Sequence, residues 1–264
     1  MTADSPANRR SPLRQLRGKL VVGIRRRLTA PLTARTRLES YRRYHRLRRR
    51  LAPHRYTDTD PFTLVRVDPT EINRSVLEWT PRLPQWGRVV GGDWDRRWEP
   101  FEERAVYRGL CQRYREGMAW EETALYEAFL DQLERFGNAW EHGSVTAFET
   151  RCREIDRLYE SIRDQGYRTQ ADLADVSEPR LAHLRDEINV DVGRDGTLYW
   201  RTYGQHRLAI AKLLDLETVP VMIHRRHQRW QALRERCREG EGAPRAAGGD
   251  LHPDLRDVLA GDHW

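Results

Sequence analysis

The segment that most constrains the fold is residues 188–224, where a nearly all-apolar helix is predicted between strands. Residues 206–214 (HRLAIAKLL) carry apolar side chains on almost every helical face. Such a helix has no polar side to turn to water, so it must be buried. Apolar and polar residues alternate over residues 188–192, and an Arg-Asp-Gly turn predicts a hairpin that returns over residues 197–203. Another strand follows at residues 219–224, so the pattern predicts an α+β fold with this helix packed on a sheet.

Hydrophobic periodicity predicts the remaining elements of the chain. The expected elements are a strand at residues 62–67 and helices at residues 41–51, 98–136, 144–164 and 226–239. Residues 79–95 are rich in Pro, Gly and Trp and are typical of an ordered loop, because tryptophan is unfavourable in disordered segments. We expect Trp86, Trp94 and Trp98 to be mostly buried where residues 80–150 pack on the core.

Charge divides the chain into a basic arm and an acidic body. Residues 1–55 have a balance of +15, whereas the rest of the chain has a balance of −8. Tyr44, Leu47 and Leu51 share one stripe of the helix predicted in the arm, and this stripe fits the body, a membrane surface or a nucleic acid equally well. At the other end, residues 240–249 (GEGAPRAAGG) predict a flexible tail over residues 240–264.

Several protein classes are excluded by what the sequence lacks. No stretch approaches the roughly 20 apolar residues of a membrane span. The apolar run at residues 20–24 is too short for a signal peptide and is followed by three arginines. Three widely spaced cysteines argue against a disulfide scaffold or a zinc ribbon, so we expect a cytoplasmic protein. The motifs of P-loop NTPases, zincins and α/β-hydrolases do not occur.

The tetrapeptide Gly204-Gln205-His206-Arg207, a G-x-H-R sequence, predicts a phosphate-binding site. Gly204 permits a tight turn from strand to helix, and a helix N-terminus offers unpaired N–H groups and partial positive charge. Two cationic residue types are unfavourable for stability at that end of a helix, which favours a role in holding an anion. The structural alternative pairs Arg207 with an acid such as Asp191 and places His206 in the core.

Three segments together resemble the ParB/sulfiredoxin-like superfamily: residues 62–73 (FTLVRVDPTEIN), residues 158–166 (LYESIRDQG) and residues 188–224. The last segment follows the order of that family's phosphate-binding box, with a hairpin, a glycine, an Ala/Leu-rich helix and a Val-Pro-Val strand. The resemblance implies a ParB/sulfiredoxin-like domain over residues 56–239, with a mostly helical insertion at residues 80–150. It also implies that ATP or CTP is the ligand.

Departures from the family narrow the activities that the resemblance implies. Sulfiredoxins resemble this box with a catalytic cysteine where Gln205 stands, so reduction of sulfinic acids is excluded. Only about 25 residues follow Glu239, too few for the helix-turn-helix module of ParB proteins. Kinases of this fold need a carboxylate base, and the open candidates here are Asp191, Glu187 and Glu71.

Asp93 and Asp95, in the run Gly-Gly-Asp-Trp-Asp, are the candidate ligands for a Mg²⁺ ion that accompanies a phosphate. Asp95 equally suits the N-cap of the helix predicted after it. The sequence thus predicts a protein that binds a nucleoside triphosphate or a phosphorylated small molecule, for phosphotransfer or as a nucleotide switch. The alternative function is nucleic-acid binding, with the arginines of residues 1–55 on the phosphate backbone; an anionic membrane surface is a further partner for this arm.

Overall fold

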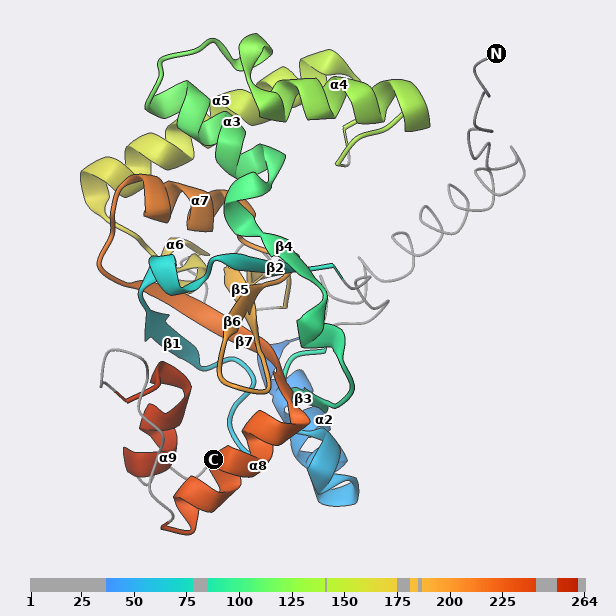
Figure 1. Cartoon of the computed structure of the whole chain (residues 1–264), viewed down its shortest axis with the longest axis vertical. Helices are drawn as coiled ribbons and strands as arrows, with labels where there is room; N and C mark the ends of the chain where they lie inside the picture. Colours follow the sequence, from blue (N-terminus) through green and yellow to red (C-terminus); the bar gives the residue numbers. More distant parts are fainter. Residues whose placement is uncertain are drawn as a thin grey trace, which may run out of the picture.

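The computed structural model describes residues 37–77, 85–140, 142–174, 181–184, 187–240 and 251–260. The predictions for residues 1–36, 79–84, 240–249 and 261–264 lie outside these ranges, except at Gly240. The described part is an α+β structure built on a mixed sheet, as predicted (Figure 1). Within these ranges, no helix has both the length and the apolar character needed to cross a membrane.

The elements follow one another in the order below. The strands are β1 (Leu64–Val67), β2 (Arg74–Val76), β3 (Arg88–Val90), β4 (Trp98–Pro100), β5 (Ile188–Val192), β6 (Leu198–Trp200) and β7 (Val219–His227). The α-helices are α2 (Leu38–Leu51), α3 (Ala105–Tyr114), α4 (Ala124–Phe136), α5 (Val145–Gln165), α6 (Gln170–Ala174), α7 (Gln205–Leu213), α8 (Gln228–Arg238) and α9 (Arg256–Ala260). Short 3₁₀ turns are η1 (Pro53–Arg55), η2 (Pro69–Glu71), η3 (Trp94–Arg96), η4 (Phe101–Glu103), η5 (Trp120–Glu122), η6 (Leu181–Leu184) and η7 (Pro253–Leu255).

Strand β7 is the centre of the sheet, and all of its residues are buried. It runs antiparallel to β1 and parallel to β5. The predicted β5–β6 hairpin is confirmed, and β6 then pairs in parallel with β2, which pairs antiparallel with β4. Strand β3 extends the other side of β7, where Arg88 pairs with Arg225. A strand paired along both edges leaves few backbone groups unsatisfied, which explains how β7 tolerates complete burial.

The two faces of the sheet carry different cores. Ile188, Val190 and Val192 of β5 point to the larger core, which includes the buried residues of α7. The complete burial predicted for this helix is therefore confirmed. Helices α3 and α5 pack on α7, and Figure 1 shows α3, α4 and α5 together beyond it. On the opposite face Asn189 accepts a 2.8 Å hydrogen bond from Trp86, which belongs to a smaller core below α2.

The helix predicted over residues 98–136 is wrong in its extent. Trp98 begins β4, and two separate helices, α3 and α4, follow. Their close approach depends on Gly109, where an added Cβ would lie 2.4 Å from that of Leu125. Residues 80–150 are thus not simply a helical insertion, because β3 and β4 belong to the sheet.

The tryptophan prediction holds in two cases of three. Trp86 and Trp94 are buried as expected, but Trp98 is 39% exposed. The side chain of Trp98 lies at the edge of the sheet, where the guanidinium of Arg74 covers its ring at 4.4 Å. An arginine stacked on the indole replaces the core packing that was predicted.

The C-terminal segment is docked, so the predicted flexible tail is wrong for residues 251–260. Asp254 is buried and accepts hydrogen bonds from Arg226 at 2.8 Å and from the indole of Trp230 at 2.8 Å. The Arg234 guanidinium lies 3.3 Å from the same carboxylate. Although burial opposes ionisation, Arg226 and Arg234 hold the pKa of Asp254 at about 2. This cluster fastens the chain end to β7 and α8.

Replacing Asp254 with alanine tests this clamp. The substitution leaves two buried guanidinium groups without their carboxylate, which costs about 3–5 kcal/mol of unfolding free energy. Urea denaturation followed by circular dichroism measures the loss. Asp131→Ala is the matched control: it removes an exposed pair with Arg135 on α4 and costs at most about 0.5 kcal/mol. Equal stability of the two variants would contradict a docked C-terminal segment.

Candidate functional site

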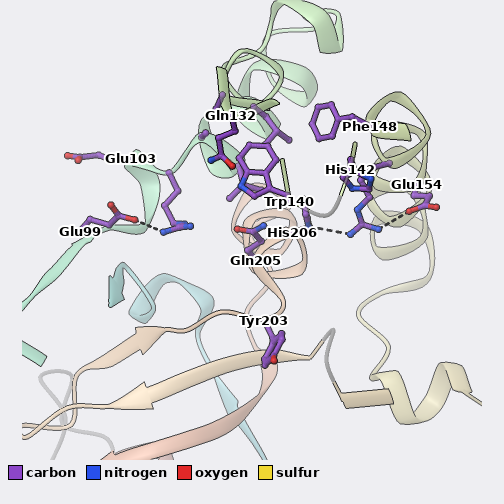
Figure 2. Close-up of a pocket in the computed structure, with 16 residues that line it drawn as sticks. Glu99, Glu103, Gln132, Trp140, His142, Phe148, Glu154, Tyr203, Gln205 and His206 are labelled. Carbon is purple, nitrogen blue, oxygen red and sulfur yellow. Dashed lines mark hydrogen bonds and ion pairs between the residues drawn. The ribbon is translucent and has the colours of Figure 1, made fainter. Parts of the chain in front are cut away.

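A cleft separates the start of α7 from the helices that cover it. It consists of two adjoining cavities of about 730 and 420 Å³. Residues that line both cavities are Arg151, Glu154, Tyr203, Gln205 and His206. Helices α3, α4 and α5 supply the opposite wall, and Figure 2 shows Trp140 and Phe148 on that side. The predicted tetrapeptide, residues 204–207, therefore does line a cavity.

Gly204 makes the turn that aims α7 at the cleft. Its φ is 71°, in the left-handed region, and an added Cβ would lie 2.5 Å from the Cα of Ile188. No side chain caps the helix, and its first backbone bond runs from Leu208 N to Gly204 O at 2.9 Å. The N–H groups of Gln205, His206 and Arg207 precede this bond and have no partner within the helix. The turn thus provides an uncapped helix N-terminus at the cleft.

Arg207 lines the smaller cavity, but its guanidinium is buried and engaged with the segment between α5 and α6. Its Nη1 donates to the carbonyl of Arg168 at 2.9 Å, and the group lies 5.3 Å from the Tyr167 ring centre. With the Gln170 amide oriented to satisfy both groups, its oxygen accepts from Arg207 Nε at 2.9 Å. These contacts fasten the chain after α5 against the first turn of α7.

His206 and Arg151 meet inside the cleft. The Nη2 of Arg151 lies 3.5 Å from Nδ1 of His206, and its Nη1 donates to Glu154 at 2.9 Å (Figure 2). Burial, together with the charge of Arg151, lowers the pKa of His206 to about 3. The imidazole is therefore neutral at physiological pH, and Arg151 is the charged group nearest to the helix N-terminus in this pair.

Backbone strain is concentrated around the cleft. Three non-glycine residues in the described ranges have positive φ, and two of them, Thr202 at 60° and Trp140 at 43°, line it. Trp140 is 39% exposed, although its ring lies against Phe129 and Phe148 at 6.3 and 6.0 Å. A strained residue persists only where its surroundings hold it, and such residues cluster at binding sites.

The charged residues on the cleft walls are balanced in number. The acidic ones are Glu99, Glu103 and Glu154, and the basic ones are Arg104, Arg151 and Arg207. Arg104 is paired with Glu99, as Arg151 is with Glu154. Glu103 is exposed and has no ion-pair partner in the part of the chain that the structure describes.

The three carboxylates predicted as a base do not line the cleft. Asp191 is buried on the other face of the sheet and accepts from Arg201 at 2.9 Å and Arg225 at 2.7 Å. Burial alone would raise its pKa, but these two guanidinium groups hold the pKa at about 2. The alternative pairing of Arg207 with Asp191 is therefore wrong.

Glu187 and Glu71 also serve other parts of the fold. Glu187 lies close to Arg207, where its Oε1 accepts the backbone N–H of Gln170 at 2.5 Å, and burial raises its pKa. Glu71 ends η2, and partial burial raises its pKa as well. Neither carboxylate is part of the cleft wall.

Asp93 and Asp95 form a latch with Arg194 rather than an open pair of ligands. Arg194 Nη2 lies 2.7 Å from Asp93 Oδ1 and 2.6 Å from Asp95 Oδ1. Asp95 also accepts the backbone N–H of Arg194 at 2.9 Å, and against the effect of burial Arg194 lowers the pKa of Asp95 to about 2. Asp95 lies inside η3, so the predicted N-cap is wrong. No group of three or more residues suited to a metal ion occurs in the described ranges.

No protein-family model, curated protein or solved structure matches this chain. The resemblance to the ParB/sulfiredoxin-like superfamily thus stays a prediction carried by the residues quoted above.

Sequence reasoning missed the opposite wall of the cleft. Trp140, His142 and Arg151 belong to the segment interpreted as an insertion, and no motif marks them. One local signal was available: Gly137 ends α4 in the left-handed conformation, which places an exposed tryptophan three residues later in a tight turn.

Gly204→Ala tests the turn at the start of α7. The new side chain meets both positive φ, at about 1–2 kcal/mol, and the backbone of Ile188, which adds about 1–3 kcal/mol of crowding. Gly117→Ala is the matched control, since its φ is +74° but nothing lies within 4 Å of the new Cβ. Chemical denaturation should show Gly204→Ala to be the less stable variant. Equal losses would mean that the close approach to Ile188 is unimportant.

The buried state of His206 predicts acid sensitivity. Its pKa is about 3 in the folded chain against 6.5 for an unperturbed histidine, so the unfolded chain alone takes up a proton between these values. The contribution to stability is complete above pH 6.5 and is lost as pH falls toward 3. Between pH 7 and pH 5 the loss is up to about 2 kcal/mol.

His206→Gln should therefore reduce the difference in unfolding free energy between pH 7 and pH 5. His54→Gln, at an exposed histidine in η1, should leave that difference at the wild-type value. Urea unfolding at the two pH values provides the measurement. A wild-type difference in His206→Gln would place the imidazole in contact with solvent.

Proposed function

We propose that the cleft binds a nucleoside triphosphate or another phosphate ligand, with a phosphate group against the first turn of α7. The observation that carries the proposal is the uncapped N-terminus of a buried helix that opens into a cavity of about 730 Å³. Ligand sites for small molecules commonly have volumes of about 300–1,000 Å³.

The first turn of α7 supplies the anion-binding chemistry. Unpaired N–H groups and the helix dipole favour negative charge at that end. Gln205 and the neutral His206 add hydrogen-bond donors, and Arg151 adds a positive charge beside them. The strength of charge-assisted hydrogen bonds makes Arg151 the side chain that contributes most to phosphate affinity.

The aromatic side of the cleft suits the base of a nucleotide. Trp140 offers an exposed ring on the wall opposite Gln205 and His206 (Figure 2). Stacking of a base on an aromatic side chain is tolerant of sequence and contributes about 1–3 kcal/mol. In this arrangement, the larger cavity holds the nucleoside and the smaller one holds the phosphates.

Arg207 acts in this proposal through the structure around it. A guanidinium that reached the phosphate would first have to leave the Arg168 carbonyl and Gln170. We therefore assign Arg207 to positioning the segment after α5, and we assign direct contact with phosphate to the backbone of residues 205–207 and to Arg151. This differs from the expectation for a G-x-H-R box, in which the arginine grips the phosphate.

Support for a ParB/sulfiredoxin-like reading comes from the order hairpin, Gly204, buried helix and strand. ATP or CTP then remains the first ligand to test. Glu103 is the carboxylate that this proposal offers to an acceptor hydroxyl or, with Glu99, to a Mg²⁺ ion bound to the phosphates. Phosphotransfer requires such a group, whereas a nucleotide switch does not.

A thermal-shift screen with ATP, CTP, GTP and nucleotide sugars, with and without Mg²⁺, tests the proposal. Calorimetric titration of the best ligand then compares Arg151→Gln with Arg153→Gln. Both arginines lie on α5, but Arg153 is exposed and bonds to Thr150 outside the cleft. Loss of a hydrogen bond to a charged group should weaken binding about 10- to 150-fold in Arg151→Gln alone.

Two results would sink the proposed function. One is the absence of any stabilisation of the wild-type chain by phosphate ligands at millimolar concentration. The other is wild-type affinity in a folded Arg151→Gln protein, with circular dichroism used to confirm that the variant is folded.

A further inference from the structure

Helix α2 turns an apolar stripe toward the outside of the molecule. The stripe consists of Tyr44, Leu47 and Leu51, whose exposed fractions are 49%, 55% and 72%. Three large side chains exposed side by side on one helix are unusual, because helices of globular proteins normally turn such residues to the core. The stripe therefore requires a reason other than packing within the described part of the chain.

The opposite side of α2 is firmly attached to the body. Leu38 and His45 are buried beneath the helix, and Tyr41 donates to the Trp86 carbonyl at 3.2 Å. Arg42 donates to Asp60 at 2.8 Å, which fixes the helix from one flank. The orientation of the stripe is thus set before any partner arrives, so a partner need not order the helix.

Arginines border the stripe on both sides. At 3.6 residues per turn, Arg43 and Arg50 lie along one edge, and Arg48 lies along the other. Arg43 and Arg50 are exposed, and within the described ranges neither has an ion-pair partner. The helix carries six arginines and one acid, Glu39, so this face is strongly cationic around an apolar centre.

We propose that this face of α2 docks on an anionic membrane surface, with Tyr44, Leu47 and Leu51 inserted between the lipid headgroups. A helix with an apolar stripe flanked by cations lies in the membrane interface and gains from both area burial and attraction to anionic lipids. The preceding sequence has the same character: residues 20–24 (LVVGI) are apolar and are followed by three arginines.

A nucleic acid explains this face less well than a lipid surface does. Phosphate backbones are bound by arginines, which would leave the two leucines in the centre of the contact without a favourable environment. Lipid headgroups provide the negative charge, and the acyl boundary beneath them accepts the leucines. The apolar stripe is what distinguishes the two partners.

The docking face is distant from the cleft. In Figure 1, α2 lies toward the end of the long axis opposite to α3, α4 and α5, whose residues form the far wall of the cleft. Substitutions on the exposed side of α2 therefore leave ligand binding unchanged, and the two proposals fail or succeed separately.

Vesicle co-sedimentation of the full chain tests the proposal, with phosphatidylcholine vesicles that contain or lack phosphatidylserine. Wild type should bind only the anionic vesicles. Arg43→Gln/Arg50→Gln should lower the partition constant about 30-fold, since each arginine near such a surface contributes roughly fivefold. Leu47→Ser/Leu51→Ser should lower it at least about tenfold through lost apolar burial. The matched control, Leu130→Ser/Arg135→Gln, changes an exposed leucine and an exposed arginine on α4 and should bind like wild type.

Each remaining outcome overturns the proposal. Absence of wild-type binding to anionic vesicles means that this face does not meet a membrane. Wild-type binding by Leu47→Ser/Leu51→Ser means that the arginines attract polyanions in general, and an oligonucleotide that displaces the vesicles then identifies nucleic acid as the partner. An equal loss in the α4 control means that the contact does not depend on α2.

Discussion

The close approach of Gly204 to the backbone of Ile188 is the contact on which the arrangement of the site depends. Because no side chain fits between them, the chain can leave β6, turn in the left-handed region and enter α7 directly above the first residue of β5. This turn buries α7 against the sheet and leaves the N-terminus of α7 at the edge of the core, where helices α3, α4 and α5 enclose it. A bulkier residue at this position would lift α7 from the sheet and move both walls of the cleft.

Arg207 extends this arrangement to the next segment. Its guanidinium, one helical position from the cleft, binds the Arg168 carbonyl and so ties the chain after α5 to the first turn of α7. Arg151, nearer the N-terminus of α5, is thereby held within reach of His206. The geometry of the cleft thus follows from two local devices, a glycine turn and a buried arginine, rather than from a network of charges across it. This explains why its wall charges can be balanced while its first helical turn still favours an anion.

The sequence predicted the elements whose signals are local. The β5–β6 hairpin and the buried helix follow from alternation and from an apolar surface on every side, and α5 was predicted to within one residue at each end. What it could not predict are pairings between distant residues. Trp98 begins an edge strand because Val76 lies opposite it, and Asp95 turns toward Arg194, about a hundred positions away. Trp140 and Arg151 meet the G-x-H-R box only through tertiary packing, which no periodicity records.

The charge pattern is the clearest case in which composition and structure carry different information. The net charge of +7 and the many arginines suggest a surface made for polyanions, yet Arg194, Arg226 and Arg234 are all engaged by aspartates inside the fold. An arginine that neutralises a buried aspartate contributes to stability and presents no free charge to a partner. On α2 the situation is reversed: Arg43 and Arg50 are exposed beside Leu47 and Leu51. The residues available for an external partner are therefore few and lie together, and it is their position around an apolar stripe, rather than the number of arginines, that determines which partner they fit.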